Sequence, residues 1–454
     1  MKPLDLFNET KARVPAYRNF LEKNNFEFSG GWKQIPLINK KNYLLEYATR
    51  EMCWDSSLAG CHLIGASSGF SKAGSVFWPK RAIDEKQYLA DVEQMLESYY
   101  SISKRRTLVF VCLAFGTWIG GMQIASTMRQ LAALEKYDLT VTTPSLNLAE
   151  AMDIYSEFSE NYDQFIFMTN PSNINLIMHL FRERGIEPRP GATYFPVVGE
   201  FFPESFRNKV NEFFGHTGEN AFTVWTGYGS ADTGDVAVEI APLIRLRNYI
   251  HARPELSDKL FDTTNTPFLM KLFPKAYVEI IDGRIVVTKD QMIPLVRYDT
   301  GDTGFIVHRD KLAAGGDIPS EIIAELPEEI LCISGRVDNQ IIFYGTNLSL
   351  EEINDHFNNL DQNYKYGGYY EVEQIQVGEA DVFRFYVHIA ADPTDQLQEK
   401  YQRELISFLS TRSNEFRAKY ENLSKSIGRP LIEVSLEKVD PTESKKKHKY
   451  IIKV

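Results

Sequence analysis

The sequence lacks the features that would assign it at once to several common classes of protein. Its 4 cysteines are scattered without a C-x-x-C pair, and its 8 histidines form no H-E-x-x-H pattern. These absences argue against a disulfide framework and against a metal held by protein ligands alone. A reducing cytoplasm fits this sparse use of cysteine.

Two further absences concern membranes and nucleic acids. The opening residues, MKPLDLFNETK, lack the apolar core of a signal peptide. No run of about 18 apolar residues is present that would suggest a membrane span. Lys and Arg number 50 against 61 Asp and Glu, a formal charge of −11, and a net acidic chain is a poor general binder of nucleic acid. We therefore expect neither partner, and expect a small molecule instead.

The pattern along the chain predicts an α/β protein with more than one domain. The 454 residues are 43% hydrophobic and 24% charged, which is a globular composition. From residue 107 on, short apolar runs alternate with amphipathic helical patterns, which favours mostly parallel sheets flanked by helices. Hairpins are predicted over 276–289, with Asp282-Gly283 as the turn, and over 371–391. We expect a large N-terminal domain, 1–335, and a small mobile C-terminal α+β domain, 336–454.

A Ser- and Gly-rich stretch with one lysine, LIGASSGFSKAGSVFWPK at 63–80, is the first candidate for chemistry. It is not the G-x-x-x-x-G-K-[ST] loop. Its backbone N–H groups and hydroxyls could nevertheless surround phosphate oxygens, and its lysine adds charge. The same composition also suits a mobile surface loop, and this stretch alone leaves both alternatives open.

Two motifs further along combine small, aromatic and charged residues. In TGYGSAD, at 226–232, Tyr228 could stack on a planar ring, and Asp232 could bind a hard cation such as Mg²⁺. In PLVRYDTGD, at 294–302, Asp302 could accept two hydrogen bonds from a ribose diol. Arg297 and Arg336 could donate in pairs to a phosphate. The alternatives are a Gly-rich turn with a capping aspartate and structural ion pairs.

A run of basic residues, KKKHK at 445–449, comes before the apolar strand pattern KYIIKV. Such runs are commonly solvated tails. Because the apolar segment would anchor the run near folded structure, one of its lysines could instead reach negative charge that develops in an active site.

Taken in order, these segments resemble the adenylate-forming superfamily of acyl-CoA synthetases, adenylation domains and luciferases, and within it the phenylacetate-CoA ligase branch. ASSGFSKAGS lies where that family has its phosphate loop, and YGSAD is similar to its aromatic-Gly-x-[ST]-E motif. PLVRYDTGD and ISGRVDNQIIFYGTNLSLEEI are close to its most specific motifs, and VGE at 198–200 matches its adenine wall in part. The resemblance spans nearly the whole chain. Two departures are the shifted lysine of the loop, Lys72, and Asp232 in place of glutamate.

The resemblance implies an AMP-forming acid–thiol ligase. A carboxylate attacks the α-phosphate of MgATP to give an acyl-adenylate and pyrophosphate, and a thiol then displaces AMP. ATP, Mg²⁺ and coenzyme A are the implied cofactors and acceptor. The implied catalytic residues are Lys447, with Lys449 as its rival, Asp232 for the metal, and Asp338 at the hinge between the domains.

The resemblance also implies a set of binding residues. Those for the nucleotide are Ser67, Ser68, Gly69, Ser71, Lys72, Gly199, Glu200, Tyr228, Gly229, Ser230, Arg297, Asp302 and Arg336. Those for the acyl pocket are Phe115, Gly116, Thr117, Trp118, Val198 and Thr226. The bulk of Trp118 favours an aromatic or short acid, although each aromatic residue also suits an ordinary core position.

Alternatives of other classes stay open. The acceptor could be an amine or a carrier protein rather than coenzyme A. The degenerate loop and Asp232 also fit a nucleotide-binding relative without activity. A P-loop NTPase, which would hydrolyse ATP without a carboxylic acid, is the least favoured alternative. The acid itself and the state of oligomerisation, a homodimer included, are not determined by the sequence.

Overall fold

A computed structural model describes most of the chain, which folds into two compact units. The described residues are 2–66, 76–117, 119–218, 222–261, 266–336, 340–343, 346–360, 366–377, 380–412, 416–417, 420–421, 424, 428–439 and 452–453. Unit 1 comprises Met1–Thr107, Ala114–Val141 and Trp225–Arg336, and unit 2 comprises Leu108–Leu113, Thr142–Val224 and Val337–Val454. Within the described residues, no helix has both the length and the apolar character of a membrane span.

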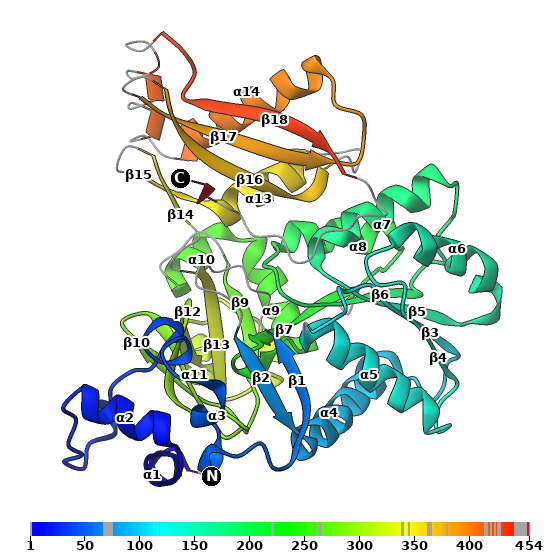
Figure 1. Ribbon diagram of the computed structural model, residues 1–454. Coiled ribbons are helices and arrows are strands. Elements are labelled where there is room, and N and C mark those ends of the chain that lie inside the picture. The colour runs from blue at the N-terminus through cyan, green and yellow to red at the C-terminus, as the bar shows by residue number, and fades with distance from the viewer. Residues whose placement is uncertain are drawn as a thin grey trace. The chain divides into compact units, whose positions relative to one another are not determined.

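The strands of unit 1 form a series of neighbouring strands in a sheet, called the run below, and one separate hairpin (Figure 1). The run has the order β10-β11-β12-β13-β9-β8-β7, and its neighbouring strands pair antiparallel. The hairpin joins β1 to β2. The bounds are β1 (Cys61–Ala66), β2 (Phe77–Arg81), β7 (Val224–Ser230), β8 (Gly234–Val238), β9 (Phe268–Leu272), β10 (Tyr277–Ile281), β11 (Arg284–Lys289), β12 (Leu295–His308) and β13 (Glu329–Arg336).

The tight turn between β10 and β11 follows from its two residues. Asp282 and Gly283 have φ of 50° and 74°, a left-handed pair that aspartate tolerates and glycine adopts at little cost. Ile281 then pairs with Arg284. The predicted hairpin over 276–289 is therefore confirmed.

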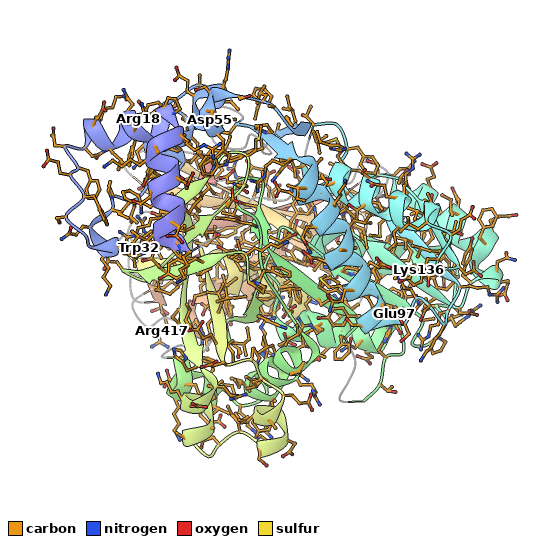
Figure 2. The ribbon with its side chains drawn as sticks, turned by 90° about the horizontal axis from the view of Figure 1, so that it is seen from below. Arg18, Trp32, Asp55, Glu97, Lys136 and Arg417 are labelled. Atoms are coloured by element: carbon orange, nitrogen blue, oxygen red, sulfur yellow. The ribbon has the colours of Figure 1, made fainter. Side chains whose placement is uncertain are left out.

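Helices of unit 1 cover its strands at several places. The N-terminal segment lies beside the strands of the run, with Arg18, Trp32 and Asp55 labelled in Figure 2, and α1 packs against β11 and β12. Helix α4 packs against β1, β2 and α5. The bounds are α1 (Pro3–Arg13), α2 (Pro15–Lys23), η1 (Trp32–Gln34), η2 (Lys40–Leu44), α3 (Thr49–Met52), η3 (Trp54–Ser56), α4 (Ala82–Tyr100), α5 (Ile119–Ala133), α9 (Ala241–His251), α10 (Pro254–Phe261), α11 (Arg309–Ala314) and α12 (Ser320–Ala324).

Unit 2 contains parallel strands from the middle of the chain and an α+β region from its end. Strands β6, β5 and β3 are neighbours in that order, and β5 pairs parallel with β6. In the C-terminal region the order is β18-β17-β16-β19, and β14 pairs with β15. The bounds are β3 (Thr107–Val111), β5 (Gln164–Met168), β6 (Thr193–Val197), β14 (Gln340–Phe343), β15 (Thr346–Ser349), β16 (Tyr366–Val377), β17 (Ala380–Ile389), β18 (Ile432–Lys438) and β19 (Ile452–Lys453). Strand β4 (Leu139–Thr142) lies where the chain passes from unit 1 to unit 2.

The helices of unit 2 pack on these strands and on one another. Helix α7 packs against β16, and α8 against α13, so the C-terminal region belongs to one compact unit with these two helices. A buried pair of amide side chains joins α7 to α13, because Asn175 Nδ2 donates to Asn358 Oδ1 at 3.1 Å. The bounds are α6 (Leu148–Phe158), η4 (Ser159–Asn161), α7 (Pro171–Glu183), α8 (Glu204–Phe213), α13 (Leu350–Leu360) and α14 (Asp395–Arg412).

The predicted α/β class is confirmed, with a mixed rather than uniformly parallel arrangement of strands. Parallel pairing occurs between β5 and β6, where α7 connects the two strands, whereas hairpins make the run of unit 1 antiparallel. The hairpin predicted over 371–391 is formed by β16 and β17. The division at 335/336 stays a prediction.

Candidate active site

Two residues predicted to bind the nucleotide lie in contact within unit 1. The hydroxyl of Tyr228, near the end of β7, donates to Asp302 Oδ2 on β12 at 2.8 Å. Thr300 Oγ1 lies 3.4 Å from the same hydroxyl and accepts the backbone N–H of Asp302 at 3.1 Å. Asp302 is only 9% exposed. The side chains expected to face the base and the ribose therefore belong to one local arrangement.

An irregular stretch of β12 orients Asp302. Gly301 has φ of 79°, and its N–H donates to Asp299 Oδ1 at 3.0 Å. The carboxylate of Asp299 also pairs with Arg284 on β11. The register of β12 with β13 shifts after Thr303. This turn-like geometry, together with the pairing of Asp302 with Arg336 on β13, holds Asp302 in place.

The turn after β7 holds Asp232. Tyr298 on β12 donates its hydroxyl to Asp232 Oδ2 at 2.6 Å. The backbone oxygen of Asp232 accepts from Gln291 Nε2, also at 2.6 Å. The N–H groups of Asp232 and Thr233 both donate to Ser230 Oγ at 3.2 Å. Ser230 therefore shapes the turn, and one carboxylate oxygen of Asp232 already has a donor.

The described residues supply Asp232 alone at the position predicted for a metal. Within the described ranges, no three His, Cys, Asp or Glu side chains group so as to hold a metal ion. Mg²⁺ commonly takes one or two carboxylates and completes its shell with water and substrate phosphates. A single carboxylate therefore fits a Mg²⁺ that arrives with ATP, and does not fit a metal held by the protein alone.

Arg297 is buried among structural partners. Its Nε lies 3.3 Å from Glu279 Oε2, and its Nη1 donates to the backbone oxygens of Lys33 and Ile35 at 2.9 and 2.5 Å. Its guanidinium carbon lies 6.0 Å from the ring centre of Trp32. Its backbone has φ of 52°, and only 4% of the residue is exposed. These contacts favour the structural alternative over the predicted phosphate contact.

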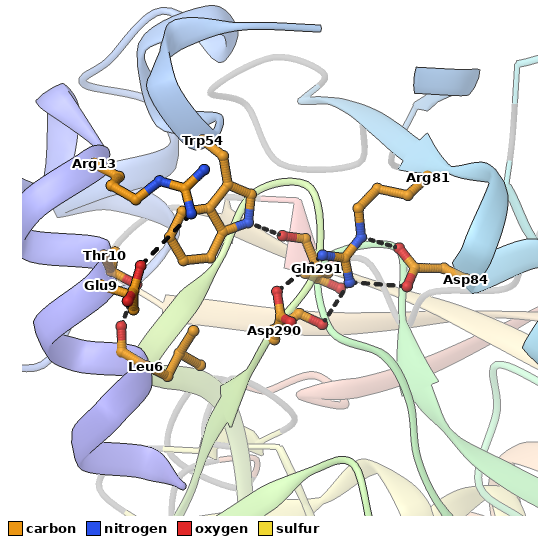
Figure 3. A network of polar contacts seen from close by, with 9 residues as sticks. All are labelled: Leu6, Glu9, Thr10, Arg13, Trp54, Arg81, Asp84, Asp290 and Gln291. Carbon is orange, nitrogen blue, oxygen red and sulfur yellow. Dashed lines mark hydrogen bonds and ion pairs between the residues drawn. The ribbon is translucent and has the colours of Figure 1, made fainter. Parts of the chain in front are cut away.

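The segment after β11 joins three parts of unit 1, and no motif predicts a role for it. Arg81, at the end of β2, forms a bidentate pair with Asp84 at 2.8 and 2.9 Å and reaches Asp290 at 3.0 Å (Figure 3). Gln291 holds the Asp232 turn, and its backbone oxygen accepts Trp54 Nε1 at 2.9 Å. Residues 290–291 therefore connect the β1–β2 hairpin, the Asp232 turn and the N-terminal segment.

The predicted pocket residues of unit 1 lie on two segments. Thr226 is 4% exposed, and its N–H donates to Glu239 Oε2 at 3.0 Å. Thr117 accepts the N–H of Ala66, the last residue of β1, at 2.6 Å. Phe115 is half-buried, whereas Gly116, with φ of 96°, and Thr117 are exposed. The segment at 115–117 is therefore joined to the strand that leads into the predicted phosphate loop.

The residues predicted on the VGE segment belong to unit 2. The N–H of Val198 donates to the backbone oxygen of Thr169 at 3.2 Å, and Gly199 has φ of 89°. Burial raises the pKa of Tyr369 on β16, and the nearby charge of Glu200 adds to this rise. Glu200 thus lies near the C-terminal sheet of its own unit.

Several predicted residues lie outside the described part of the chain. They are Ser67, Ser68, Gly69, Ser71, Lys72, Trp118, Asp338, Lys447 and Lys449. Arg336 is described only through its backbone, which pairs with Asp302. Their predicted roles stay predictions.

Comparison with solved structures identifies the fold. The chain is similar to 2-hydroxyisobutyryl-CoA ligase, solved in the postadenylation state with 2-HIB-AMP, with 14% identity over 98% of this chain and 86% of that one and a TM-score of 0.61. The acyl acid amido synthetase AtGH3.15, in complex with 2,4-DB, matches with 12% identity over 95% and 84% and a TM-score of 0.57. McyG A-PCP, complexed with phenylalanyl-adenylate, matches with 12% identity over 84% and 62% and a TM-score of 0.51.

These likenesses show that the chain has the fold of adenylate-forming enzymes, as its motifs predict. No family model matches the chain, and no curated protein sequence matches it. At identities of 12–14% the likeness concerns the fold, and the reaction has to be argued from the residues themselves.

Proposed function

We propose that the protein activates a carboxylic acid with ATP, forming an acyl-adenylate and pyrophosphate, and then transfers the acyl group to coenzyme A with release of AMP. The observation that carries this proposal is the contact between Tyr228 and Asp302. An aromatic ring beside a carboxylate that is held by backbone and hydroxyl donors is suited to a base and the adjoining ribose diol. This contact occurs on the fold of enzymes that form adenylates.

Formation of the acyl-adenylate requires positioned reactants and stabilised charge, and it requires no side-chain nucleophile. The carboxylate of the acid supplies the attacking oxygen, the α-phosphorus accepts it, and pyrophosphate leaves with its electron pair. Asp302 would hold the ribose, and Tyr228 would lie against the base. Asp232 would give one oxygen to the Mg²⁺ that accompanies ATP, which neutralises phosphate charge when bound.

The remaining roles come from the resemblance and belong to this proposal. Lys447, or its rival Lys449, would stabilise charge in the first half-reaction. Asp338 would be the hinge at which the C-terminal domain turns between half-reactions. Ser67, Ser68, Ser71 and Lys72 would contact the β- and γ-phosphates. An aromatic or short acid is the proposed substrate class.

A second acceptor class has a specific basis. The chain shares its fold with an acyl acid amido synthetase as well as with a CoA ligase, and these two likenesses have similar TM-scores, 0.57 and 0.61. Transfer of the acyl group to an amine is therefore the alternative second half-reaction. Transfer to a carrier protein is a third, since McyG A-PCP also has this fold.

One experiment tests both half-reactions. The full chain is incubated with MgATP, a panel of carboxylic acids and hydroxylamine, which traps acyl-adenylates as hydroxamates. Acids that give hydroxamate are then offered coenzyme A, amino acids or a carrier domain, and products are identified by mass. Hydroxamate and thioester are expected. If no acid supports hydroxamate formation or ATP–pyrophosphate exchange, the proposal is wrong.

A further inference from the structure

Lys80 is a buried lysine on the strand that follows the predicted phosphate loop. It is 8% exposed, and it makes no hydrogen bond or ion pair with any residue of the described part. An ammonium group carries three donors, so Lys80 Nζ can donate to a bound anion. Titratable groups with shifted pKa values cluster at functional sites.

A second lysine approaches the same place from β11. Lys289 donates one N–H to the backbone oxygen of Asp235 at 2.5 Å, which leaves further donors on the same nitrogen. Burial lowers the pKa of Lys289 to about 8, and the charge of Lys80 contributes to this lowering. Lys80 is therefore near enough for its charge to act on Lys289.

The ammonium groups of both lysines lie close to Gly234. A Cβ atom built on this glycine would lie 3.3 Å from Lys289 Nζ and 4.0 Å from Lys80 Nζ. The residue has φ of 58°, where glycine is favoured. Because both nitrogens lie near the same glycine, one anionic group placed between them could contact both. Since Gly234 pairs with Ser230 across the turn that holds Asp232, the position adjoins the candidate active site.

Carboxylates surround Lys80 at longer range. Burial lowers its pKa, while Asp235, Asp84, Glu85 and Asp232 raise it. Lys275 is a further cation whose charge acts on Lys289. These acids favour a charged Lys80 but do not satisfy its donors.

Three of the four carboxylates already have other partners. Asp84 pairs with Arg81, Glu85 accepts from Gln123 at 3.0 Å, and Asp232 accepts from Tyr298. Asp235 has an exposed side chain on β8. Among the described residues, the groups near Gly234 with donors still available are therefore the two lysines.

We propose that Lys80 and Lys289 form a subsite at Gly234 that binds an anionic oxygen group, either a phosphate or a carboxylate. Two sources have this chemistry, the pyrophosphate portion of ATP and a second carboxylate on the acid. The choice between these sources rests on the proposed function, whereas binding of an anion does not. A dicarboxylic acid would make the acid class more polar than the aromatic residues of the sequence indicate.

Binding of simple anions to the full chain tests the subsite without turnover. The probes are inorganic pyrophosphate and glutarate, with butyrate as the matched single carboxylate. The affinity of each probe is measured by titration calorimetry. Lys80→Met and Lys289→Met remove each charge and keep an unbranched side chain. Lys271→Met, at an exposed position on β9, is the control. We expect at least about tenfold weaker binding of a probe by both subsite variants and unchanged binding by the control.

The outcomes distinguish a phosphate from a second carboxylate as the bound group, and both from the absence of a subsite. A loss for pyrophosphate alone assigns the subsite to phosphate, a loss for glutarate but not butyrate assigns it to a second carboxylate, and a loss for both supports a general anion subsite. The inference is overturned if neither probe binds the wild type, or if Lys80→Met binds both probes as Lys271→Met does. A lower melting temperature of Lys80→Met with unchanged affinities would make Lys80 structural. Acid-dependent ATP–pyrophosphate exchange, measured separately, reports on the proposed function itself.

Discussion

Tyr298 donates its hydroxyl to Asp232 at 2.6 Å, and this contact joins PLVRYDTGD and YGSAD, two motifs of unit 1 that resemble those of adenylate-forming enzymes. Tyr298 is 2% exposed, so the hydroxyl is presented from a fixed ring. A hydrogen bond to a carboxylate of this kind is stronger than one between neutral groups. Tyr298 is therefore a positioning residue for Asp232 within the proposed reaction.

Tyr298→Phe is expected to weaken the use of MgATP while the fold persists. Loss of a hydrogen bond to a charged group costs about 1.5–3 kcal/mol, or roughly ten- to a hundredfold. The apparent KM for MgATP, measured over a series of Mg²⁺ concentrations, should rise, and the change in kcat should be smaller. The conservative change Phe305→Leu, on the same strand, is the control. An unchanged Mg²⁺ dependence in Tyr298→Phe would contradict the positioning role.

A buried ion pair supports the strand that carries Tyr228. Glu239 is fully buried, accepts the N–H of Thr226, and lies 3.9 Å from Arg247, which is 4% exposed at its side chain. Arg247 also packs on Phe268, 3.8 Å from its ring centre. Removing one partner of such a pair leaves a buried charge.

Glu239→Ala is expected to lower the free energy of unfolding by about 3–5 kcal/mol. The matched control is Glu325→Ala, which removes the carboxylate that pairs with Arg245 and is 51% exposed at its side chain. That variant should lose no more than about 1 kcal/mol. Urea denaturation of both variants and the wild type gives the comparison. Equal losses would show that the Glu239 pair has no special role in stability.

Local features of this structure follow from the sequence, and long-range ones do not. The turn at Asp282-Gly283 is determined by two adjacent residues, so its hairpin could be predicted. The contact of Tyr228 with Asp302 could not, because β8, β9 and β13 lie between their strands in the sheet order. The motifs predict that both residues bind the nucleotide, but only the fold shows that the two side chains are in contact.

The chemical type of a residue also left its role open. Arg297 was a candidate phosphate ligand by type, yet its donors contact Glu279 and two backbone oxygens of the N-terminal segment. Gln291 was not predicted, because a lone glutamine carries no motif, although it binds the Asp232 turn. Lys80 was not predicted either, because its burial on β2 is a property of the fold.

Lys289 should make stability depend on pH in the alkaline range. Burial lowers its pKa to about 8 in the folded protein, below its usual value near 10.5. Between these values the unfolded chain binds the proton and the folded protein releases it, so this group adds stability as pH rises from about 8 to 10.5. The difference in melting temperature, wild type minus Lys289→Met, should therefore increase across this range. A difference that is flat or falls would contradict the lowered pKa.

The basic run near the C-terminus should separate the half-reactions. Lys447→Ala is expected to suppress adenylate formation, because the resemblance places this lysine against the reacting carboxylate and phosphate. Thioester formation from a preformed acyl-adenylate should stay largely intact. Lys449→Ala, tested in the same two assays, decides between the rival lysines. If each variant loses both half-reactions equally, neither lysine has the predicted role.

Asp302→Ala tests recognition of the nucleotide most directly. Asp302 is 9% exposed and is held by Tyr228 and by its own N–H on Thr300, so its carboxylate is oriented before a ligand arrives. Two charge-assisted hydrogen bonds to a ribose diol, each worth about 1.5–3 kcal/mol, would be lost in the variant. ATP binding should weaken by a factor on the order of tens to thousands.

The same variant should lose less affinity for 2′,3′-dideoxy-ATP, which cannot make those bonds even with the wild type. Titration calorimetry of both proteins with both nucleotides gives the four affinities, and a melting curve shows whether the fold is preserved. If Asp302 only supports β12, both nucleotides will lose affinity alike and the melting temperature will fall. That result would remove the ribose assignment and, with it, the observation on which the proposed activation of an acid by ATP depends.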